Sequence, residues 1–345
     1  MVFVNTSNML QKNSRISWID MVKGYGTLFI ILGHLGNGGI FTWVYTFHVP
    51  LFFFLSGYVF SDKQGFVGFL KKKCKSLVIP YFCLGMCMVI FHVLRYFRSG
   101  NYSHEWCMEL ITSFLLQRRL WTLWYTAALF CLNIVFYLML KTLKKDWIMG
   151  IVSFILPVIG LFYYKVGGDA LIWNADVCLM AIPFFYVGYI YKKYSDKLDI
   201  VRSKKGLVVV SFVLFCVLNL VCGYLSIDES GMGLAMFYSQ YGEPIFSYIA
   251  AFAGISCVVI VSKSTFIRPI RYIGENSMLY YAWHQTIMMP VMQKILSVMG
   301  LQFLRSNGVI GYYVYRIIML VGIVALTTLC NWIIKKIGLK FILGK

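Results

Sequence analysis

Apolar stretches recur along the whole chain and are separated by short polar connections. A helix needs about 20 mostly apolar residues to cross a bilayer, and about ten stretches approach that length. They are residues 16–36, 41–60, 76–97, 121–140, 147–164, 171–191, 207–225, 244–262, 276–293 and 310–334. Because the connections are short, the pattern predicts an all-α fold, a polytopic helical bundle with about ten transmembrane helices. We expect a single domain over residues 1–345, without an appended soluble domain.

The composition is typical of a polytopic membrane protein. Of the 345 residues, 60% are hydrophobic and 13% are charged, whereas soluble domains carry about 25% charged residues. The net charge of +19 raises the question of nucleic acid binding. However, the basic residues lie in short clusters between apolar stretches, and no basic surface alternates with stacking aromatic residues. The pattern therefore argues against a nucleic-acid partner and for contact with membrane lipid.

The density of basic residues alternates from one connection to the next, as the positive-inside rule expects. The denser clusters are at residues 12–15, 63–75, 141–145, 192–205, 263–271 and 335–345. We therefore expect a multi-pass protein of the bacterial plasma or inner membrane, with both termini in the cytoplasm. The first apolar segment is too long and too charged for a cleavable signal sequence. The longest external connection, residues 99–119, is interpreted as a lip over a site or an interfacial helix.

Ten cysteines are scattered along the chain, mostly inside apolar stretches. They form no CxxC pair and no Cys/His ligand spacing, so zinc and redox motifs are unsupported. We interpret them as small buried hydrophobic residues and expect neither a metal nor a bound cofactor.

The first apolar segment carries three ionisable side chains on one helical face. Lys23 and His34 are close to three turns apart, and Asp20 lies one turn before Lys23. A charge at the centre of a bilayer costs roughly 3 kcal/mol even on insertion scales, so such groups are expected to face a protein interior or a watery cavity. We therefore interpret His34, Lys23 and Asp20 as the candidate catalytic group.

His48 opens the second apolar segment, with Pro50 in the first helical turn and Ser56 about two turns later. Because His34 ends its segment on the same side of the membrane, the two imidazoles are expected to be neighbours. Histidine is the side chain best suited to proton transfer near neutral pH. The alternative for His48 is a hydrogen-bonded structural residue at the interface.

Other polar groups are candidates for binding. The basic run at residues 71–75 contains Lys72, Lys73 and Lys75, and is either a membrane anchor or a site for phosphate groups. Trp124 begins the fourth segment, where aromatic belts are common. Asn174 and Asp176, near the outer end of the sixth segment, are expected to face the same polar interior.

A last candidate group opens the ninth segment. Glu275 and Asn276 predict a helix start, followed by Ser277. His284 lies about two turns beyond Ser277 on the same face. It is either part of the site or a satisfied histidine within the bundle.

Taken together, these stretches resemble membrane-bound acyltransferase family 3, particularly its fucose 4-O-acetylase-like branch. The matching stretches are WIDMVKGYGTLFIILGH (18–34), FHVPLFFFLSGY (47–58), KKKCKSLVIPYF (71–82), LWYTAALF (123–130), DVCLMAIPFFYVGY (176–189) and IGENSMLYYAWH (273–284). They follow the order and spacing of the family. The family's first-span basic residue and histidine correspond to Lys23 and His34, although many members have Arg at the first position. The Arg-rich third-span motif is Lys-rich here, which keeps the charge but loses planar bidentate geometry.

The resemblance implies an integral membrane O-acyltransferase, usually an O-acetyltransferase, with acetyl-CoA as the donor substrate. The acceptor would be a hydroxyl of a cell-envelope carbohydrate or lipid-linked glycan. The basic run would hold the nucleotide phosphates. His34 would be a general base or a transient acyl carrier, with the two other ionisable groups of its face setting its environment. His48, Asn174 or Asp176 would orient the acceptor.

Two other functions remain open from the residues alone. A transporter of an envelope polysaccharide precursor would also carry charges inside the membrane. Against it, no internal repeat or pair of broken helices is visible in the sequence. A membrane sensing or recognition module is the second alternative.

Overall fold

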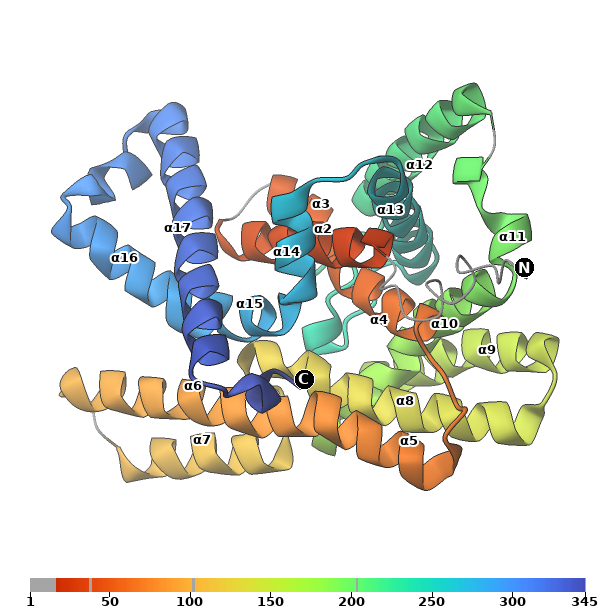
Figure 1. Cartoon of the computed structure of the whole chain (residues 1–345), viewed down its shortest axis with the longest axis horizontal. Coiled ribbons are helices and arrows are strands. Elements are labelled where there is room, and N and C mark those ends of the chain that lie inside the picture. The colour runs from red at the N-terminus through yellow and green to blue at the C-terminus, as the bar shows by residue number, and fades with distance from the viewer. Residues whose placement is uncertain (1–16, 37–38, 101–102, 203, 345) are drawn as a thin grey trace, which may run out of the picture.

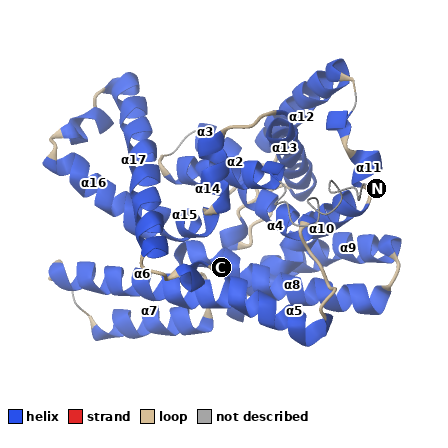
Figure 2. Ribbon diagram, in the orientation of Figure 1, coloured by secondary structure: helices blue, strands red, loops and turns tan. Residues whose placement is uncertain are grey.

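The computed structural model describes residues 17–36, 39–100, 103–202 and 204–344, which fold almost entirely into helices (Figure 2). Within these ranges there is no strand, and one isolated antiparallel bridge joins Ala235 to Gln240. The all-α prediction is confirmed for these ranges. The predictions made for residues 1–16, including the cytoplasmic N-terminus, lie outside the described residues.

The helices follow each other with short connections. The first part of the chain forms α2 (Ser17–His34), α3 (Gly39–Tyr45), α4 (His48–Tyr58), α5 (Gly65–Lys73), α6 (Ile79–Arg98), α7 (His104–Leu116), α8 (Trp124–Leu143) and α9 (Asp146–Lys165). The second part forms α10 (Ala175–Lys193), α11 (Ser195–Leu198), α12 (Lys205–Leu225), α13 (Pro244–Ser264), α14 (Arg268–Glu275), α15 (Ser277–Trp283), α16 (Met289–Val298) and α17 (Gly308–Lys336). Two π-helical turns, Cys74–Val78 and His284–Met288, join α5 to α6 and α15 to α16.

Within the described ranges, 7 helical segments are long and apolar enough to cross a membrane. They are Gly65–Arg98, His104–Leu143, Asp146–Lys165, Ile172–Lys193, Lys205–Leu225, Pro244–Ser264 and Gly308–Lys336. The fold is therefore that of a multi-pass helical membrane protein, but the expected number of about ten spans is not confirmed. The expected spans outside this set are α2, which carries charged residues, the interrupted pair α3–α4, and the segment with the π-helical turn after α15.

Figure 1 shows α2 and α14 in the middle of the molecule, with α16 and α17 to one side and α12 and α13 to the other. The helices α5 and α6 run end to end beneath them, with α7 alongside α6. The region interpreted as a lip or an interfacial helix contains α7, which packs on α6 through a hydrogen bond. In that bond the hydroxyl of Tyr81 donates to the carbonyl oxygen of Phe114 at 3.0 Å.

The main apolar core lies where α4 crosses α10, and glycine makes this crossing possible. A Cβ on Gly57 would lie 1.9 Å from the carbonyl oxygen of Phe185, and one on Gly188 would lie 1.9 Å from that of Phe54. Small residues at such crossings let two helix backbones approach closely inside a membrane. Phe53, Phe54, Phe184 and Phe185 fill the core beside the crossing. The position of α4, and of the side chains on its other face, therefore depends on this contact.

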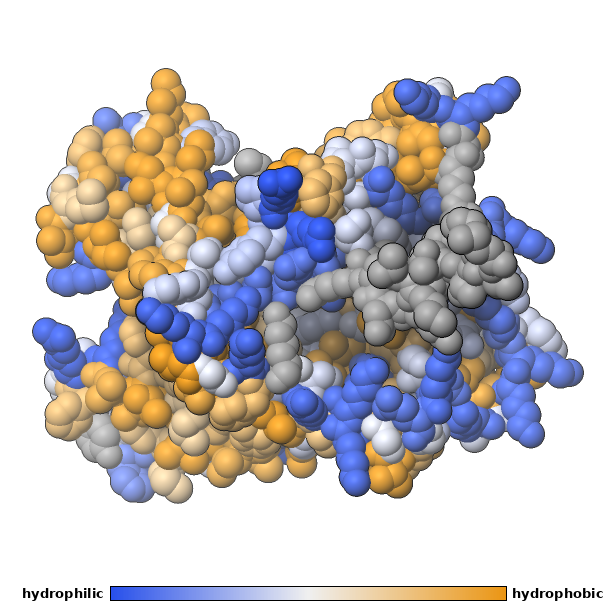
Figure 3. All heavy atoms as spheres, in the orientation of Figure 1, coloured by the Kyte–Doolittle hydropathy of each residue, from blue (hydrophilic) through white to orange (hydrophobic). Residues whose placement is uncertain are grey.

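The outward faces of several helices are apolar. On α12 the exposed side chains include Val209, Val213, Leu220 and Val221, and α9 presents Ile151, Phe154 and Val158. In Figure 3 apolar side chains cover the region of α16 and α17, while hydrophilic side chains gather nearer the middle of this face. Apolar surfaces of this extent are expected against lipid.

Candidate functional site

A cavity of about 620 Å³ lies in the centre of the molecule. Its walls come from α2, α4, the start of α8, α15 with the following π-helical turn, and residues 234–238. This volume falls within the range of small-molecule sites, about 300–1,000 Å³. The cavity is the main candidate for a functional site.

Three helices each present one face to this cavity. On α2 the lining residues include Lys23 and His34, which are eleven positions apart. On α4 the lining residues include His48, Phe52, Leu55 and Ser56. On α15 they include Ser277 and Tyr281, followed by His284 at the start of the π-helical turn. Steps of three and four residues place these side chains on one helical face. The cavity therefore runs along three helices rather than across them.

The helices α2 and α4 run in opposite directions. Trp18 near the start of α2 contacts Tyr58 at the end of α4, with ring centroids 4.9 Å apart. At the other end His34 contacts Tyr45, which in turn contacts His48 at the start of α4. The cavity thus has two chemically different ends.

The first is the histidine end, which consists of His34, Tyr45, His48 and His284. The ring centroids of His34 and His284 lie 5.0 Å apart, those of His34 and Tyr45 6.1 Å, and those of Tyr45 and His48 4.7 Å. The imidazoles of His34 and His48 lie near each other, as expected, and the Tyr45 ring contacts both of them. His284 joins them from a distant part of the sequence.

Backbone carbonyls fix the tautomer of two of these histidines. The Nδ1 of His48 lies 2.8 Å from the carbonyl oxygen of Val44, and that of His284 lies 3.0 and 2.9 Å from those of Tyr280 and Tyr281. A carbonyl oxygen only accepts hydrogen bonds, so each Nδ1 carries the proton. In the neutral ring Nε2 then carries a lone pair. For His284, Nε2 is buried without a partner among the described residues.

His34 differs from both of these histidines. No hydrogen bond to its ring is present among the described residues, and its side chain lines the cavity. Its ring nitrogens are therefore available to a ligand. In an arrangement of this kind His34 can take up a proton, while His48 and His284 offer acceptors that orient a hydroxyl group.

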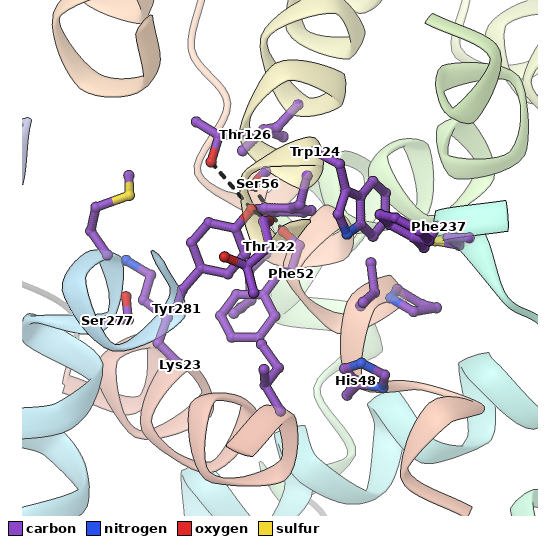
Figure 4. Close-up of a pocket in the computed structure, with 18 of the residues that line it drawn as sticks. Lys23, His48, Phe52, Ser56, Thr122, Trp124, Thr126, Phe237, Ser277 and Tyr281 are labelled. Carbon is purple, nitrogen blue, oxygen red and sulfur yellow. Dashed lines mark hydrogen bonds between the residues drawn. The ribbon is translucent and has the colours of Figure 1, made fainter. Parts of the chain in front are cut away.

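The second is the lysine end, which consists of Lys23, Lys73 and Ser277. Lys73 ends α5, with its Nζ 5.5 Å from the centre of the Phe69 ring. Figure 4 shows Lys23 and Ser277 to one side of the cavity and His48 to the other. Of the three candidate lysines in the basic run, Lys73 lines the cavity, whereas Lys72 and Lys75 are exposed and do not line it.

Asp20 lies away from the cavity, unlike its expected partner Lys23. Its side chain is buried, at 1% exposure, and does not line the cavity. The same part of α2 packs directly on α14, since a Cβ on Gly24 would lie 2.0 Å from the carbonyl oxygen of Ile270. This contact turns Lys23 toward the cavity and holds it there.

An aromatic wall lies opposite α2. Trp124 and Phe237 meet edge to face with ring centroids 6.0 Å apart (Figure 4). The hydroxyl of Tyr281 donates to the carbonyl oxygen of Thr122, and the hydroxyl of Thr126 lies 3.4 Å from that of Tyr281. These bonds tie α15 to the start of α8 beside the cavity.

Asn174 and Asp176 support this wall without lining the cavity. Asn174 accepts from the backbone N–H of Arg119 at 2.9 Å, and its amide donates to the carbonyl oxygens of Gln117 and Trp124 at 2.8 and 3.2 Å. Gln117, Arg119 and Trp121 have positive φ, a backbone conformation that costs energy unless its surroundings hold it. The hydrogen bonds of Asn174 hold this part of the backbone in that conformation.

Asp176 holds residues 234–238 in place. It forms an ion pair with Arg119 and accepts from the hydroxyl of Ser239 at 2.5 Å. Arg119 also donates to the carbonyl oxygen of Met236 at 3.2 Å. Asn174 and Asp176, which were predicted to orient the acceptor, thus lie behind the wall and hold it, and do not line the cavity.

Glu275 and Asn276 also lie outside the cavity, while Ser277 lines it. Glu275 ends α14 and accepts from Nε of Arg271 at 2.9 Å, and the predicted helix begins at Ser277. Asn276 lies between the two helices and accepts from Nζ of Lys335 at 2.5 Å. The bond to Lys335 therefore ties the start of α15 to α17, whereas the bond between Arg271 and Glu275 lies within α14.

Several lining residues were not expected from the sequence. Tyr45, Tyr281 and residues 234–238 all line the cavity. Tyr45 lies one turn before His48, and Tyr281 lies one turn after Ser277, so helical spacing from predicted residues would have indicated both. Residues 234–238 carry no such signal, because they lie in a connection far from the other motifs.

The described ranges contain no cluster of three or more His, Cys, Asp or Glu side chains arranged to hold a metal ion. A comparison with protein families matches residues 16–335 to a family described as "Acyltransferase domain". Neither the search among curated proteins nor the search among solved structures gives a match.

Proposed function

Because the chain belongs to acyltransferase family 3 over residues 16–335, we propose that this membrane acyltransferase is an O-acetyltransferase. It moves the acetyl group of acetyl-CoA to a hydroxyl of a cell-envelope carbohydrate or lipid-linked glycan, in the manner of the fucose 4-O-acetylase-like branch. The observation that carries the proposal is that one cavity has histidines at one end and lysines at the other. The donor and the base can both be placed in it.

The lysine end is proposed as the place where the donor's phosphates bind. Lys23 and Lys73 supply positive charge there, and ammonium groups bind phosphate as point charges. The eleven residues from Lys23 to His34 correspond to about 16 Å along α2. An extended thioester arm lying along this face brings its carbonyl carbon to the histidine end.

His34 is proposed as the general base. It takes the proton from the acceptor hydroxyl as the hydroxyl oxygen bonds to the thioester carbonyl carbon. The carbon–sulfur bond then breaks, and the departing thiolate receives the proton from His34. In the variant mechanism, a nitrogen of His34 attacks the thioester carbonyl carbon first, and the carbon–sulfur bond breaks to release the thiolate. The acceptor hydroxyl then attacks the acetylated imidazole, the carbon–nitrogen bond breaks, and the hydroxyl proton passes to the thiolate.

Substitution of His34 tests this assignment. We expect purified His34→Ala protein to fold normally and to lose transfer from radiolabelled acetyl-CoA by about 10²–10⁴-fold, the usual contribution of a general base. His104→Ala is the matched control, because His104 is exposed at the start of α7. Full activity of His34→Ala would exclude the assignment, and transport without acetyl transfer by the unaltered protein would favour the transporter alternative.

The proposed site predicts its orientation in the membrane. The lysine end faces the cytoplasm, where acetyl-CoA is made available, and the histidine end lies toward the outer half of the membrane. The distribution of basic residues supports this orientation, since the positive-inside rule leads us to expect both termini in the cytoplasm of a bacterial cell.

A further inference from the structure

A second cavity of about 360 Å³ meets the first one at His34. From α2 it is lined by Gly33, His34, Leu35 and Gly36, which are the last residues of the helix and those after it. The first cavity is lined from α2 by Lys23, Ile30 and His34. His34 is the one described residue that the two cavities share. Along α2 the two cavities therefore follow each other, with His34 at the junction.

The second cavity differs from the first in its chemistry. Its remaining walls come from α3, α16, α17 and the segment between α16 and α17. Gln293 and Arg305 line it together with aromatic side chains, among them Tyr312. The amide and the guanidinium can form hydrogen bonds with hydroxyl and anionic groups, and the aromatic rings offer apolar faces. This combination suits a sugar ring that carries an anionic group.

Buried Arg316 holds this cavity against the end of α2. The Arg316 side chain is 5% exposed, and its Nη2 donates to the carbonyl oxygen of Leu32 at 3.3 Å. Its guanidinium carbon lies 5.4 Å from the centre of the Tyr312 ring. A cation is favourable at the C-terminal end of a helix, where carbonyl oxygens lack partners. Arg316 thus fixes Tyr312 and the last turn of α2 relative to each other.

Arg305 is a basic residue on the side of the membrane where the sequence has few of them. It lies in the connection between α16 and α17, which the basic-residue pattern places outside the membrane. Arg305 is exposed at the mouth of the second cavity and donates no described side-chain hydrogen bond there. Its guanidinium is available to a ligand that reaches His34 from the outer side.

We infer that the second cavity is the acceptor site, and that Arg305 selects an acceptor with an anionic group close to the hydroxyl that is acetylated. This inference rests on the proposed function. The anionic group is a carboxylate of an acidic sugar or a phosphate of a lipid-linked carrier. In either case the acceptor hydroxyl reaches His34 from the second cavity while the thioester reaches it from the first.

The test compares purified, full-length Arg305→Gln with Lys294→Gln. Lys294 is a matched control because it is an exposed basic residue on α16 that lines neither cavity. The acceptors are a glucuronic-acid disaccharide, its neutral glucose counterpart and a polyprenyl-diphosphate-linked neutral sugar. Acetyl transfer is measured with each acceptor, and binding of each is measured separately by thermal stabilisation of the protein in detergent.

We expect Arg305→Gln to raise the KM of one anionic acceptor by about 10- to 100-fold relative to the neutral disaccharide, and to weaken its binding in parallel. An effect on the disaccharide alone identifies the carboxylate as the group recognised, and an effect on the lipid-linked sugar alone identifies the phosphate. We expect Lys294→Gln to leave unchanged the ratio of the KM of each anionic acceptor to that of the neutral disaccharide. Equal effects of Arg305→Gln on all three acceptors, or no effect, would overturn the inference.

The two proposals can fail separately. If the unaltered protein transfers acetyl groups but does not distinguish anionic from neutral acceptors, only the acceptor inference fails. If no acetyl transfer from acetyl-CoA occurs to any acceptor, the proposed function fails and the acceptor inference fails with it. Binding selectivity that depends on Arg305 in a protein without acetyl transfer would instead point to a carrier of anionic glycans.

Discussion

The three imidazoles of the site differ in what their ring nitrogens contact. Those of His48 and His284 donate from Nδ1 to backbone carbonyl oxygens, while the ring of His34 makes no hydrogen bond within the described ranges. His284 also begins a π-helical turn, a feature that often occurs at functional sites. Under the proposed mechanism, these contacts suit His284 to a positioning role and leave the ring nitrogens of His34 available for proton transfer.

This difference predicts distinct effects for two substitutions of His284. His284→Asn keeps a donor near the position of Nδ1 but loses Nε2, so we expect kcat for acetyl transfer to fall about 100-fold. His284→Gln places an amide near Nε2 and is expected to recover part of that loss. Steady-state kinetics with both variants separates kcat from the KM of acetyl-CoA. Equal losses in the two variants, or a change confined to the KM of acetyl-CoA, would contradict the positioning role.

Helix crossings decide where these side chains lie. The α4–α10 crossing positions α4, and hence His48, through the close approach at Gly57 and Gly188. The α2–α14 crossing does the same for Lys23 through Gly24. Each crossing buries glycine on one face of a helix and directs polar side chains on another face to the cavity.

The close approach predicts that a single methyl group at Gly57 destabilises the protein. In Gly57→Ala the new Cβ overlaps the carbonyl oxygen of Phe185, so the two helices must separate. We expect a loss of about 1–3 kcal/mol, the usual cost of overpacking. Thermal unfolding in detergent measures it. Gly206→Ala in α12 is the control, because no atom lies within 4 Å of its added Cβ; equal unfolding temperatures of the two variants would contradict the prediction.

At the scale of the whole molecule, the histidine end and the lysine end of the first cavity give the proposed reaction a direction across the membrane. The lysine end, the shared His34 and the second cavity follow one another along α2. A donor and an acceptor can therefore approach from opposite sides and meet at one imidazole. The aromatic wall that lines the first cavity is held by Asn174 and Asp176.

This direction predicts that acetyl-CoA is used from one side of the membrane only. In sealed vesicles, acetyl-CoA should support transfer only when it is added on the cytoplasmic side, because the proposed orientation directs the lysine end to that side. Lys73→Gln should raise the KM for acetyl-CoA about tenfold, since it removes a charged phosphate contact. Lys72→Gln is the control, because Lys72 is exposed and does not line the cavity. Transfer with acetyl-CoA on either side would argue against the proposed orientation.

The sequence alone determined the class of the protein and identified two of the ionisable side chains that line its main cavity. Apolar segment length predicted a helical membrane protein, because the bilayer imposes that length on each span. The cost of charge in lipid singled out Lys23 and His34, and both line the cavity. The predicted number of about ten spans is not confirmed, because several segments that build the site are polar or interrupted.

Only the tertiary structure decided which of the candidate residues meet. Helical periodicity tells which side chains share a face of one helix, but not which other helix that face meets. Inside a membrane the outer faces are also apolar, so hydrophobic periodicity distinguishes the faces poorly. The convergence of His34 with His284, the burial of Asp20 away from the cavity and the second cavity beside His34 all follow from helix crossings. Those crossings depend on contacts between residues far apart in the chain, which no local pattern encodes.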